Sequence, residues 1–269
     1  MPYEKFRKEV ERILKEKEKP LSWNEIKESS TKLKQKAPYH VYVQKLQGDI
    51  GLVRFKYSQK TVWALRKWFE EGKYKEFLPD KVRFTILSSS KEEDHAIAAN
   101  EYWELKRIYP FRTGLSRWDV IEAKVEEFFP EDDKRPDSIR IKVDGIEHLR
   151  SIEDDEKRIK IVEKISESGE FLHTDAWKGK TLGLTKPRFR CFYFYDTKCQ
   201  FFCDQSVCVG HDMEIEEQGE SVEIKGDKVF FVLEAVEGEA SEFIWGKPRV
   251  KWRIKSVISL TDPQQQRLL

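Results

Sequence analysis

The amino-acid sequence predicts a protein of the α+β class built from three consecutive parts. Apolar residues recur at helical spacing near the N-terminus, whereas short alternating strands separated by turn residues fill the chain from Phe171 onward. A chain of 269 residues is also long for a single domain. We therefore expect an N-terminal domain over residues 1–78, a mixed α+β segment over 79–170, a β-rich domain over 171–262 and a frayed tail over 263–269.

Three helices are expected in the N-terminal domain. The first is indicated by apolar residues at helical spacing, and Pro20 ends it. Ser22 followed by Glu25 forms a capping box that opens the second helix, and Pro38 lies where a third helix would begin. The apolar residues of the first helix are Phe6, Val10, Ile13 and Leu14, and those of the third are Val41, Val43, Leu46 and Ile50.

A β-hairpin is expected directly after the third helix. Two alternating segments, Leu52–Tyr57 and Thr61–Leu65, flank the polar tip Ser58–Lys60. The order of three helices and a hairpin is that of the winged-helix variant of the helix-turn-helix, whose third helix enters the major groove while the wing touches the backbone. The sequence therefore predicts an N-terminal winged helix.

The same segment resembles the winged-helix domains common in archaeal DNA-associated proteins. The resemblance covers about residues 5–70 and is carried by LSWNEIK at 21–27, QKAP at 35–38, DIGLVR at 49–54 and TVWAL at 61–65. It implies a winged-helix fold with duplex DNA as the partner. A composition rich in Lys, Glu, Arg and Ile with only two Met also resembles that of thermophile proteins.

Charge is divided unevenly along the chain, although the formal net charge is only +1. Residues 1–75 hold 19 Lys/Arg against 10 Asp/Glu, a net +9, and the remaining residues hold 31 against 39, a net −8. Such asymmetry indicates an anionic partner at the basic end. Duplex DNA is therefore the expected partner, with a protein-interaction adaptor as the alternative because winged helices also dock proteins.

Position along the winged helix predicts which side chains contact DNA. Residues that precede the third helix lie where the helix dipole favours phosphate, polar residues on the helix can reach base edges, and basic residues of the wing contact the backbone. The expected phosphate contacts before the helix are Lys34, Gln35 and Lys36, the base contacts are His40, Tyr42, Gln44 and Lys45, and the wing contacts are Arg54, Lys56 and Lys60.

The middle segment is expected to mix helices and strands. Ser90 is the expected N-cap of a helix that runs from about Glu92 to Ile108, and a second helix is expected from about Ser116 to Phe129. The remaining expected elements are strands at Val82–Leu87 and Ser138–Val143 and a charged helix from about Asp154 to Ser166.

A cluster of carboxylates in this segment leaves a Mg²⁺-dependent nuclease open as an alternative function. Such nucleases combine an Asp with a later Glu-x-Lys to hold Mg²⁺ and orient water. Asp137 is followed by a strand that lacks the Glu, and Asp227 is followed by Glu234 without the Lys, so no catalytic motif is complete. A solvated acidic turn is the favoured interpretation of Glu126, Glu127, Glu131, Asp132, Asp133 and Asp137.

All four cysteines fall close together in the β-rich part of the chain. Zn²⁺ selects thiolate and imidazole ligands, and the candidates are Cys199, Cys203, Cys208 and His211. Only Cys199 and Cys203 have the usual spacing of a ligand pair, and Cys191 lies in an aromatic strand. Buried thiols or a disulfide are therefore favoured, with a zinc site or a reactive thiol as alternatives.

The β-rich part is expected to form a small barrel or sandwich. Aromatic and basic residues alternate in residues 187–195 and 245–253, a pattern that suits single-stranded nucleic acid, but an ordinary sheet with aromatics inside and charges outside is the favoured interpretation. Effector sensing or dimerisation are further roles that this part could supply. We expect a cytoplasmic protein without a membrane partner, because the sequence shows neither an apolar leader nor a long apolar run.

Overall fold

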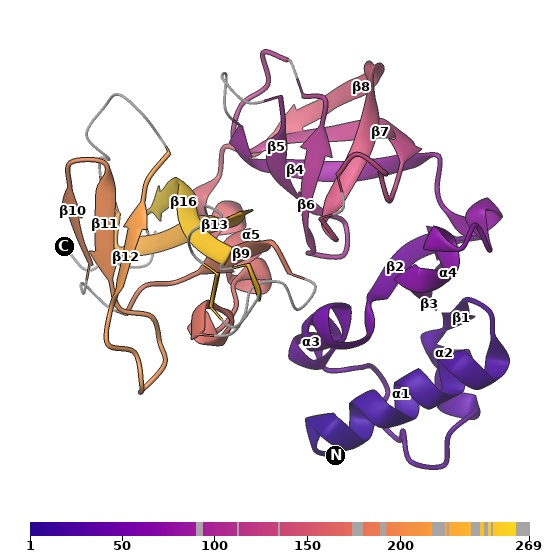
Figure 1. Ribbon diagram of the computed structural model, residues 1–269. Helices are drawn as coiled ribbons and strands as arrows, with labels where there is room; N and C mark the ends of the chain where they lie inside the picture. The colour runs from indigo at the N-terminus through magenta and orange to yellow at the C-terminus, as the bar shows by residue number, and fades with distance from the viewer. Residues whose placement is uncertain are drawn as a thin grey trace.

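A computed structural model describes residues 1–89, 94–111, 113–133, 135–173, 180–188, 192–216, 224, 226–237, 243–244, 247–248 and 250–261. In Figure 1 an N-terminal domain of helices and a small sheet lies below a closed barrel, and a β-rich C-terminal region lies beside both. The predicted α+β class and the β-rich C-terminal region are confirmed. No helix of the described residues is long and apolar enough to cross a membrane.

The N-terminal domain contains short helices around a three-stranded antiparallel sheet with the strand order β1-β3-β2. Its elements are α1 (Tyr3–Lys17), β1 (Leu21–Ser22), α2 (Trp23–Glu28), α3 (His40–Ile50), β2 (Leu52–Tyr57), β3 (Lys60–Leu65), α4 (Arg66–Glu70) and the 3₁₀ helix η1 (Lys75–Phe77). Ser22 caps α2 as predicted, since its hydroxyl accepts from the Glu25 amide while the Glu25 carboxylate accepts from the Ser22 amide. Gly51 ends α3 with φ 62°, a conformation that favours glycine and turns the chain into β2.

The apolar faces of the helices and the hairpin form one core. Phe6, Leu14, Leu46 and Trp63 are all buried in it. Val41, which was expected on the apolar side of the third helix, is 58% exposed. The helix begins at His40 and buries residues 43 and 46, and this places position 41 on the opposite side.

Five strands form the barrel in the closed order β4-β5-β6-β8-β7, in which β6 and β8 run parallel and the other pairs are antiparallel. The strands are β4 (Lys81–Ser89), β5 (Ala96–Asn100), β6 (Leu105–Tyr109), β7 (Asp119–Glu127) and β8 (Ser138–Ser151). The long strand β8 pairs with β6 at its start and with β7 along its length. The strands predicted at 82–87 and 138–143 lie within β4 and β8.

Both helices predicted before residue 130 are wrong, because the chain forms strands there. Every residue of β5 is buried, so this strand shows no alternation by which the sequence could reveal it. In β7, Ile121 and Ala123 face the barrel core at the period of two that is typical of a strand. Ser90 and Glu92, the expected cap and first turn, lie outside the described residues.

The charged helix α5 (Asp155–Ile165) follows the barrel, close to its predicted bounds. Asp154 caps it by accepting from the Glu156 and Lys157 amides. The 3₁₀ helix η2 (Gly169–His173) comes next.

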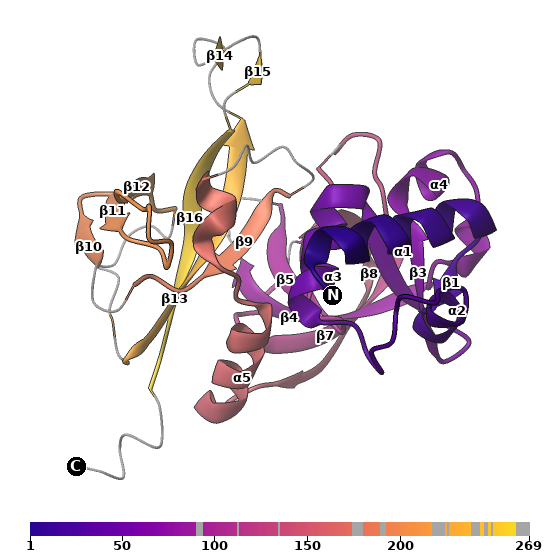
Figure 2. The ribbon, with the colours of Figure 1, turned by 90° about the horizontal axis from the view of Figure 1, so that it is seen from below.

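Three further sheets make up the C-terminal region, with the orders β16-β13-β9, β10-β11-β12 and β14-β15. Their strands are β9 (Leu182–Thr185), β10 (Phe192–Tyr195), β11 (Lys198–Phe201), β12 (His211–Glu214), β13 (Lys228–Glu237), β14 (Phe243–Ile244), β15 (Lys247–Pro248) and β16 (Val250–Leu260). In Figure 2 the sheet of β10, β11 and β12 lies to the side of the long strands β13 and β16. The predicted tail at 263–269 lies outside the described residues.

The barrel and the C-terminal sheet share a hydrophobic core. Ile97 and Val120 of the barrel pack in one buried cluster with Leu184, Phe230 and Ile258 of the sheet, and α5 adds apolar residues to the same cluster. The middle segment and the β-rich region are therefore packed together across residue 170.

Candidate nucleic-acid interface and thiol–imidazole cluster

The loop before α3 carries two of the predicted phosphate contacts at the surface. Lys34 and Lys36 are exposed, and Gln35 between them is half-buried. The indole nitrogen of Trp23 donates to the Lys36 carbonyl at 3.2 Å, and the Trp23 ring lies 5.3 Å from that of Trp63. The loop is thereby held against the N-terminal sheet, with both lysines open to solvent.

The hairpin carries two further exposed lysines. Lys56 lies near the end of β2 and Lys60 begins β3, and the two residues between the strands, Ser58 and Gln59, have positive φ as tight hairpin turns require. Within the described part of the chain, none of Lys34, Lys36, Lys56 and Lys60 forms a salt bridge, although the charge of Lys60 acts on the Glu25 carboxylate. We call these four residues the free lysines.

Three of the predicted base contacts on α3 meet the protein's own chain. His40 Nε2 lies 2.9 Å from the Lys164 carbonyl oxygen, and the Gln44 amide donates to the Ile165 carbonyl at 3.5 Å. The contacted carbonyls belong to the last turn of α5, where the helix itself provides no donors. Both views show α3 on the side of its domain that faces α5 and the C-terminal region (Figure 1, Figure 2).

Lys45 makes the third contact from α3 to the rest of the chain. Its ammonium group lies 3.0 Å from the Glu170 carboxylate on η2, with the two side chains 45% and 58% exposed. The same ammonium group lies 5.8 Å from the centre of the Tyr3 ring. The polar side of α3 is therefore engaged by residues 164–170 in this arrangement.

The two remaining predicted contacts hold the N-terminal domain together and attach it to the barrel. Tyr42 packs its ring against Phe6, and its hydroxyl donates to the Met1 carbonyl at 3.1 Å. Arg54 Nε lies 2.9 Å from the Glu104 carboxylate, and these side chains are only 11% and 4% exposed. Arg54 is therefore largely closed to DNA in this arrangement, whereas Tyr42 is half-buried.

Several acidic residues of the middle segment, which suggested a nuclease as an alternative function, form ion pairs or hydrogen bonds. Arg135 pairs with Asp133 at 2.7 Å, and Arg140 pairs with Glu127 at 3.2 Å and also with Asp132. Asp137 accepts from the amide of Thr181 at 2.9 Å. Among the described residues, these carboxylates do not form a group close enough to share one ion.

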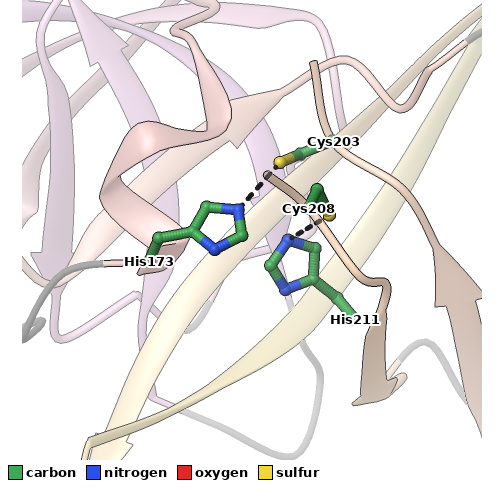
Figure 3. Close-up of side chains that lie close together, drawn as sticks. All are labelled: His173, Cys203, Cys208 and His211. Carbon is green, nitrogen blue, oxygen red and sulfur yellow. Dashed lines mark hydrogen bonds between the residues drawn. The ribbon is translucent and has the colours of Figure 1, made fainter. Parts of the chain in front are cut away.

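A cluster of two thiols and two imidazoles lies in the C-terminal region (Figure 3). The ligand atoms of His173, Cys203, Cys208 and His211 all lie within 4.8 Å of one another. His173 Nε2 is 3.2 Å from Cys203 Sγ, and His211 Nε2 is 3.4 Å from Cys208 Sγ. His173 ends η2, the two cysteines lie in the loop between β11 and β12, and His211 begins β12. We call this group the thiol–imidazole cluster.

The cluster differs from the predicted ligand set at one position. Cys199 is fully buried on β11, where its thiol donates to the neighbouring Gln200 carbonyl at 3.6 Å, and it does not belong to the cluster. His173 takes its place, although no local spacing could have indicated a residue so far from Cys203 in the sequence. Cys199, Cys203 and Cys208 are free thiols, and Cys191 lies outside the described residues.

Burial shifts the pKa values of groups in the cluster. It raises the pKa of the Cys203 thiol and lowers the pKa of His211 to about 4, to which the charge of His173 also contributes. For Cys208, burial opposes the thiolate, but hydrogen bonds from the backbone of Cys203 and Gly210 lower its pKa overall.

Aromatic residues lie on both faces of β10. Tyr193 is 68% exposed and its ring stacks on that of Tyr195 at 6.0 Å, whereas Phe192 and Phe194 pack towards Phe231 in the core. The Tyr195 hydroxyl donates to Asp212 at 2.7 Å. One face of the strand is therefore an ordinary sheet interior, as the alternation of residues predicts.

No family model matches the chain, and no curated protein is significantly similar to it. Similar solved structures include a murine DNA-binding protein bound to double-stranded DNA, with 12% identity over 67% of this chain and 100% of that chain and a TM-score of 0.29. The p204 HINb domain matches with 11% identity, 66% and 95% coverage and a TM-score of 0.30. The Ifi202 HINa domain, solved in complex with a 20-base-pair duplex, matches with 12% identity, 67% and 96% coverage and a TM-score of 0.32. At these TM-scores the likeness establishes neither the fold nor the function of this chain.

Proposed function

We propose that the protein binds duplex DNA, with residues 1–78 acting as a winged helix. The observation that carries the proposal is the set of four free lysines, Lys34, Lys36, Lys56 and Lys60, on the loop before α3 and on the hairpin. A winged helix contacts the DNA backbone from both of these places. The order of three helices followed by a hairpin, with β1 paired to the hairpin, supports the same interpretation.

The free lysines suit phosphate contacts. A Lys ammonium that has no carboxylate partner loses no ion pair when it binds phosphate, and it releases a counterion from the DNA. Residues 29–48 contain basic side chains but no Asp or Glu, so nothing in that stretch opposes the approach of a polyanion. Binding through these lysines is therefore expected to be strong at low salt and to depend little on base sequence.

Base reading by α3 needs a rearrangement. Gln44 and Lys45 would have to exchange their contacts with Ile165 and Glu170 for contacts with bases. Because the Lys45–Glu170 pair is largely exposed, it contributes only about 0–1 kcal/mol, and breaking it costs little. The major groove of a DNA duplex and residues 164–170 would thus compete for the same side of α3.

The proposal is tested by titrating the full chain against a fluorescent duplex while the salt concentration is varied. Each of the substitutions Lys34→Ala, Lys36→Ala, Lys56→Ala and Lys60→Ala is expected to reduce the slope of log affinity against log salt by about 1. Lys157→Ala, which removes an exposed lysine on α5 beside Asp154, is the matched control and should leave the slope unchanged. Binding that is flat in salt, or an equal loss in the control, would contradict the proposal.

A protein-interaction adaptor is the second candidate. Tyr39 and Val41, at the start of α3, are each 58% exposed, and exposed apolar residues on a helix suit a protein partner. This candidate predicts no salt-dependent affinity for duplex DNA, so the same titration separates the two functions.

A further inference from the structure

We infer that His173, Cys203, Cys208 and His211 bind a single Zn²⁺ ion in a closed structural site. The inference concerns the C-terminal region alone and does not depend on DNA binding. It also replaces Cys199 of the ligand set expected from the sequence with a histidine from a different part of the fold.

The distances within the cluster fit a tetrahedral ion. With Zn–S near 2.3 Å and Zn–N near 2.0–2.1 Å, neighbouring nitrogen and sulfur ligands lie about 3.5 Å apart, and two sulfur ligands about 3.8 Å apart. The two nitrogen–sulfur distances in the cluster are 3.2 and 3.4 Å, and all ligand atoms lie within 4.8 Å of one another. The remaining pairs, all within 4.8 Å, would have to close by at most about 1.5 Å to complete the tetrahedron. Figure 3 shows the four side chains converging from separate segments.

The chemistry of the donors selects zinc. Two thiolates and two imidazoles in a tetrahedral arrangement suit Zn²⁺, whereas Mg²⁺ and Ca²⁺ prefer oxygen ligands. Four protein ligands also leave no open coordination position for water or substrate. The ion would therefore stabilise the fold and would not act in catalysis.

Contacts other than those of the ligand atoms hold η2 against the loop that carries Cys203 and Cys208. The Gly169 amide donates to Asp204 at 2.7 Å, and the Gln205 amide donates to the Ser168 hydroxyl at 2.6 Å. A Cβ atom at Gly169 would lie only 2.4 Å from the Cβ atom of Cys203, so a glycine is required for this approach. The backbone of η2 is thus docked on the cysteine loop by groups that would not themselves bind the ion.

The site explains how a very small sheet is held in place. Strands β10, β11 and β12 have four residues each, and so short a sheet buries little apolar surface of its own. Zinc would join this sheet, through His211 and the cysteine loop, to η2 on the other side. Metal binding would then contribute directly to the folding free energy of the C-terminal region.

The first experiment measures metal in the full chain purified without chelators and without a metal-affinity tag. Elemental analysis is expected to show about one zinc per chain. X-ray absorption at the zinc edge should fit two sulfur and two nitrogen neighbours, whereas the set with Cys199 would give three sulfurs and one nitrogen. Cobalt added to the metal-depleted chain should give the visible absorption of a tetrahedral site with thiolates. Absence of zinc together with absence of cobalt binding, or a three-sulfur fit, would overturn the inference.

The second experiment uses variants of the full chain. His173→Gln and Cys203→Ser are expected to reduce bound zinc to below about one fifth of an equivalent, since each removes one of four ligands. Cys199→Ala is the matched control, because it removes a buried thiol on the adjacent strand that lies outside the cluster, and it should retain the full equivalent. Full zinc retention in His173→Gln would overturn the inference. The absorption measurements on the unmodified chain decide the matter if a variant does not fold.

Discussion

Arg107 on β6 and Glu234 on β13 form an ion pair in which neither side chain has any exposed surface. Arg107 Nε donates to the Glu234 carboxylate at 2.8 Å, and its Nη1 group donates to the hydroxyls of Ser138 and Thr181 at 3.3 and 3.4 Å. The pair joins β6 of the barrel to β13 of the C-terminal sheet through buried polar groups. Arg253 also contacts the Glu234 carboxylate, at 3.0 Å, so that more than one guanidinium group pairs with this carboxylate.

Glu234→Gln is expected to lower the free energy of unfolding by about 3–5 kcal/mol, because it leaves the buried Arg107 without a counter-charge. Urea unfolding followed by circular dichroism measures the change. Lys160→Ala, which breaks an exposed pair with Glu156, should cost less than about 1 kcal/mol. The double variant Arg107→Met, Glu234→Leu should recover part of the loss. A Glu234→Gln chain as stable as the Lys160→Ala control would show that the pair contributes little.

Glu9 is expected to make the N-terminal domain less stable in acid. The hydrogen bond that its carboxylate accepts from Arg12 lowers the pKa of Glu9 most, and burial opposes this effect. Hydrogen bonds from Ser30 and Lys32 lower the pKa further, and the result is a pKa of about 2. Because the folded pKa lies below the ordinary value, the stabilisation is present above about pH 4.5 and is lost as the pH falls towards 2. Glu9→Gln should cost about 1.5–3 kcal/mol at pH 7 and progressively less below pH 4 in urea titrations. A difference that does not vary with pH would contradict this assignment.

Glu170→Ala is expected to tighten duplex binding by up to about fivefold, because it releases Lys45 from a pair worth at most about 1 kcal/mol. Lys45→Ala should then weaken binding more in the Glu170→Ala background than in the unmodified chain. Fluorescence anisotropy at a fixed salt concentration measures all four combinations. Glu163→Ala on α5 removes the same charge from a side chain that does not contact α3, and it serves as the control. An equal gain in the control would mean that net charge alone is responsible.

Arg54→Ala and Lys56→Ala should affect different properties, although the two residues lie on the same strand. Arg54 is paired with Glu104 away from solvent, so its loss should lower the free energy of unfolding by about 3 kcal/mol and leave the salt dependence of DNA binding unchanged. Lys56 is exposed, so its loss should reduce that salt dependence by about 1 without a change in stability. The opposite pattern would place Arg54 at the DNA.

Gly169→Ala is expected to speed the loss of zinc to a chelator, because the added methyl group would displace η2 from Cys203. Release is followed with a chromophoric chelator under conditions in which the protein remains folded. Gly114→Ala is the matched control, since a Cβ atom there meets no atom within 4 Å. Equal release rates in the two variants would show that η2 is not needed to hold the ion.

Local patterns account for what the sequence predicted correctly. The buried face of α1, the capping box at Ser22 and the hairpin tip at Ser58 all depend on residues a few positions apart, and each agrees with the structure. Of the barrel strands, β5 and β7 differ most from the prediction. In β5 the burial of every residue removes the alternation, and along and beside β7 the residues Trp118, Ile121, Val125 and Phe128 follow a helical spacing.

In the candidate sites, too, the sequence predicts groups of residues that are close in the chain but not contacts between distant segments. Cys203, Cys208 and His211 are close in the sequence and could be grouped, whereas His173 joins them only because η2 folds back onto the cysteine loop. Likewise, Lys34 and Lys60 could be placed on loops and turns from the sequence alone. The contacts of His40, Gln44 and Lys45 with residues 164–170 depend on how the domains pack, which no local pattern encodes.

The short helix η2 carries both Glu170, which pairs with Lys45 of α3, and His173, which belongs to the thiol–imidazole cluster. If binding at one of these sites changes the affinity of the other, the change is reciprocal. If an ion stabilises η2 and thereby strengthens its contact with Lys45 of α3, it lowers the affinity of the protein for a duplex that separates α3 from η2. Binding of the duplex then lowers the affinity for the ion by the same factor. Because the Lys45–Glu170 pair contributes only about 0–1 kcal/mol, this factor would be at most about five.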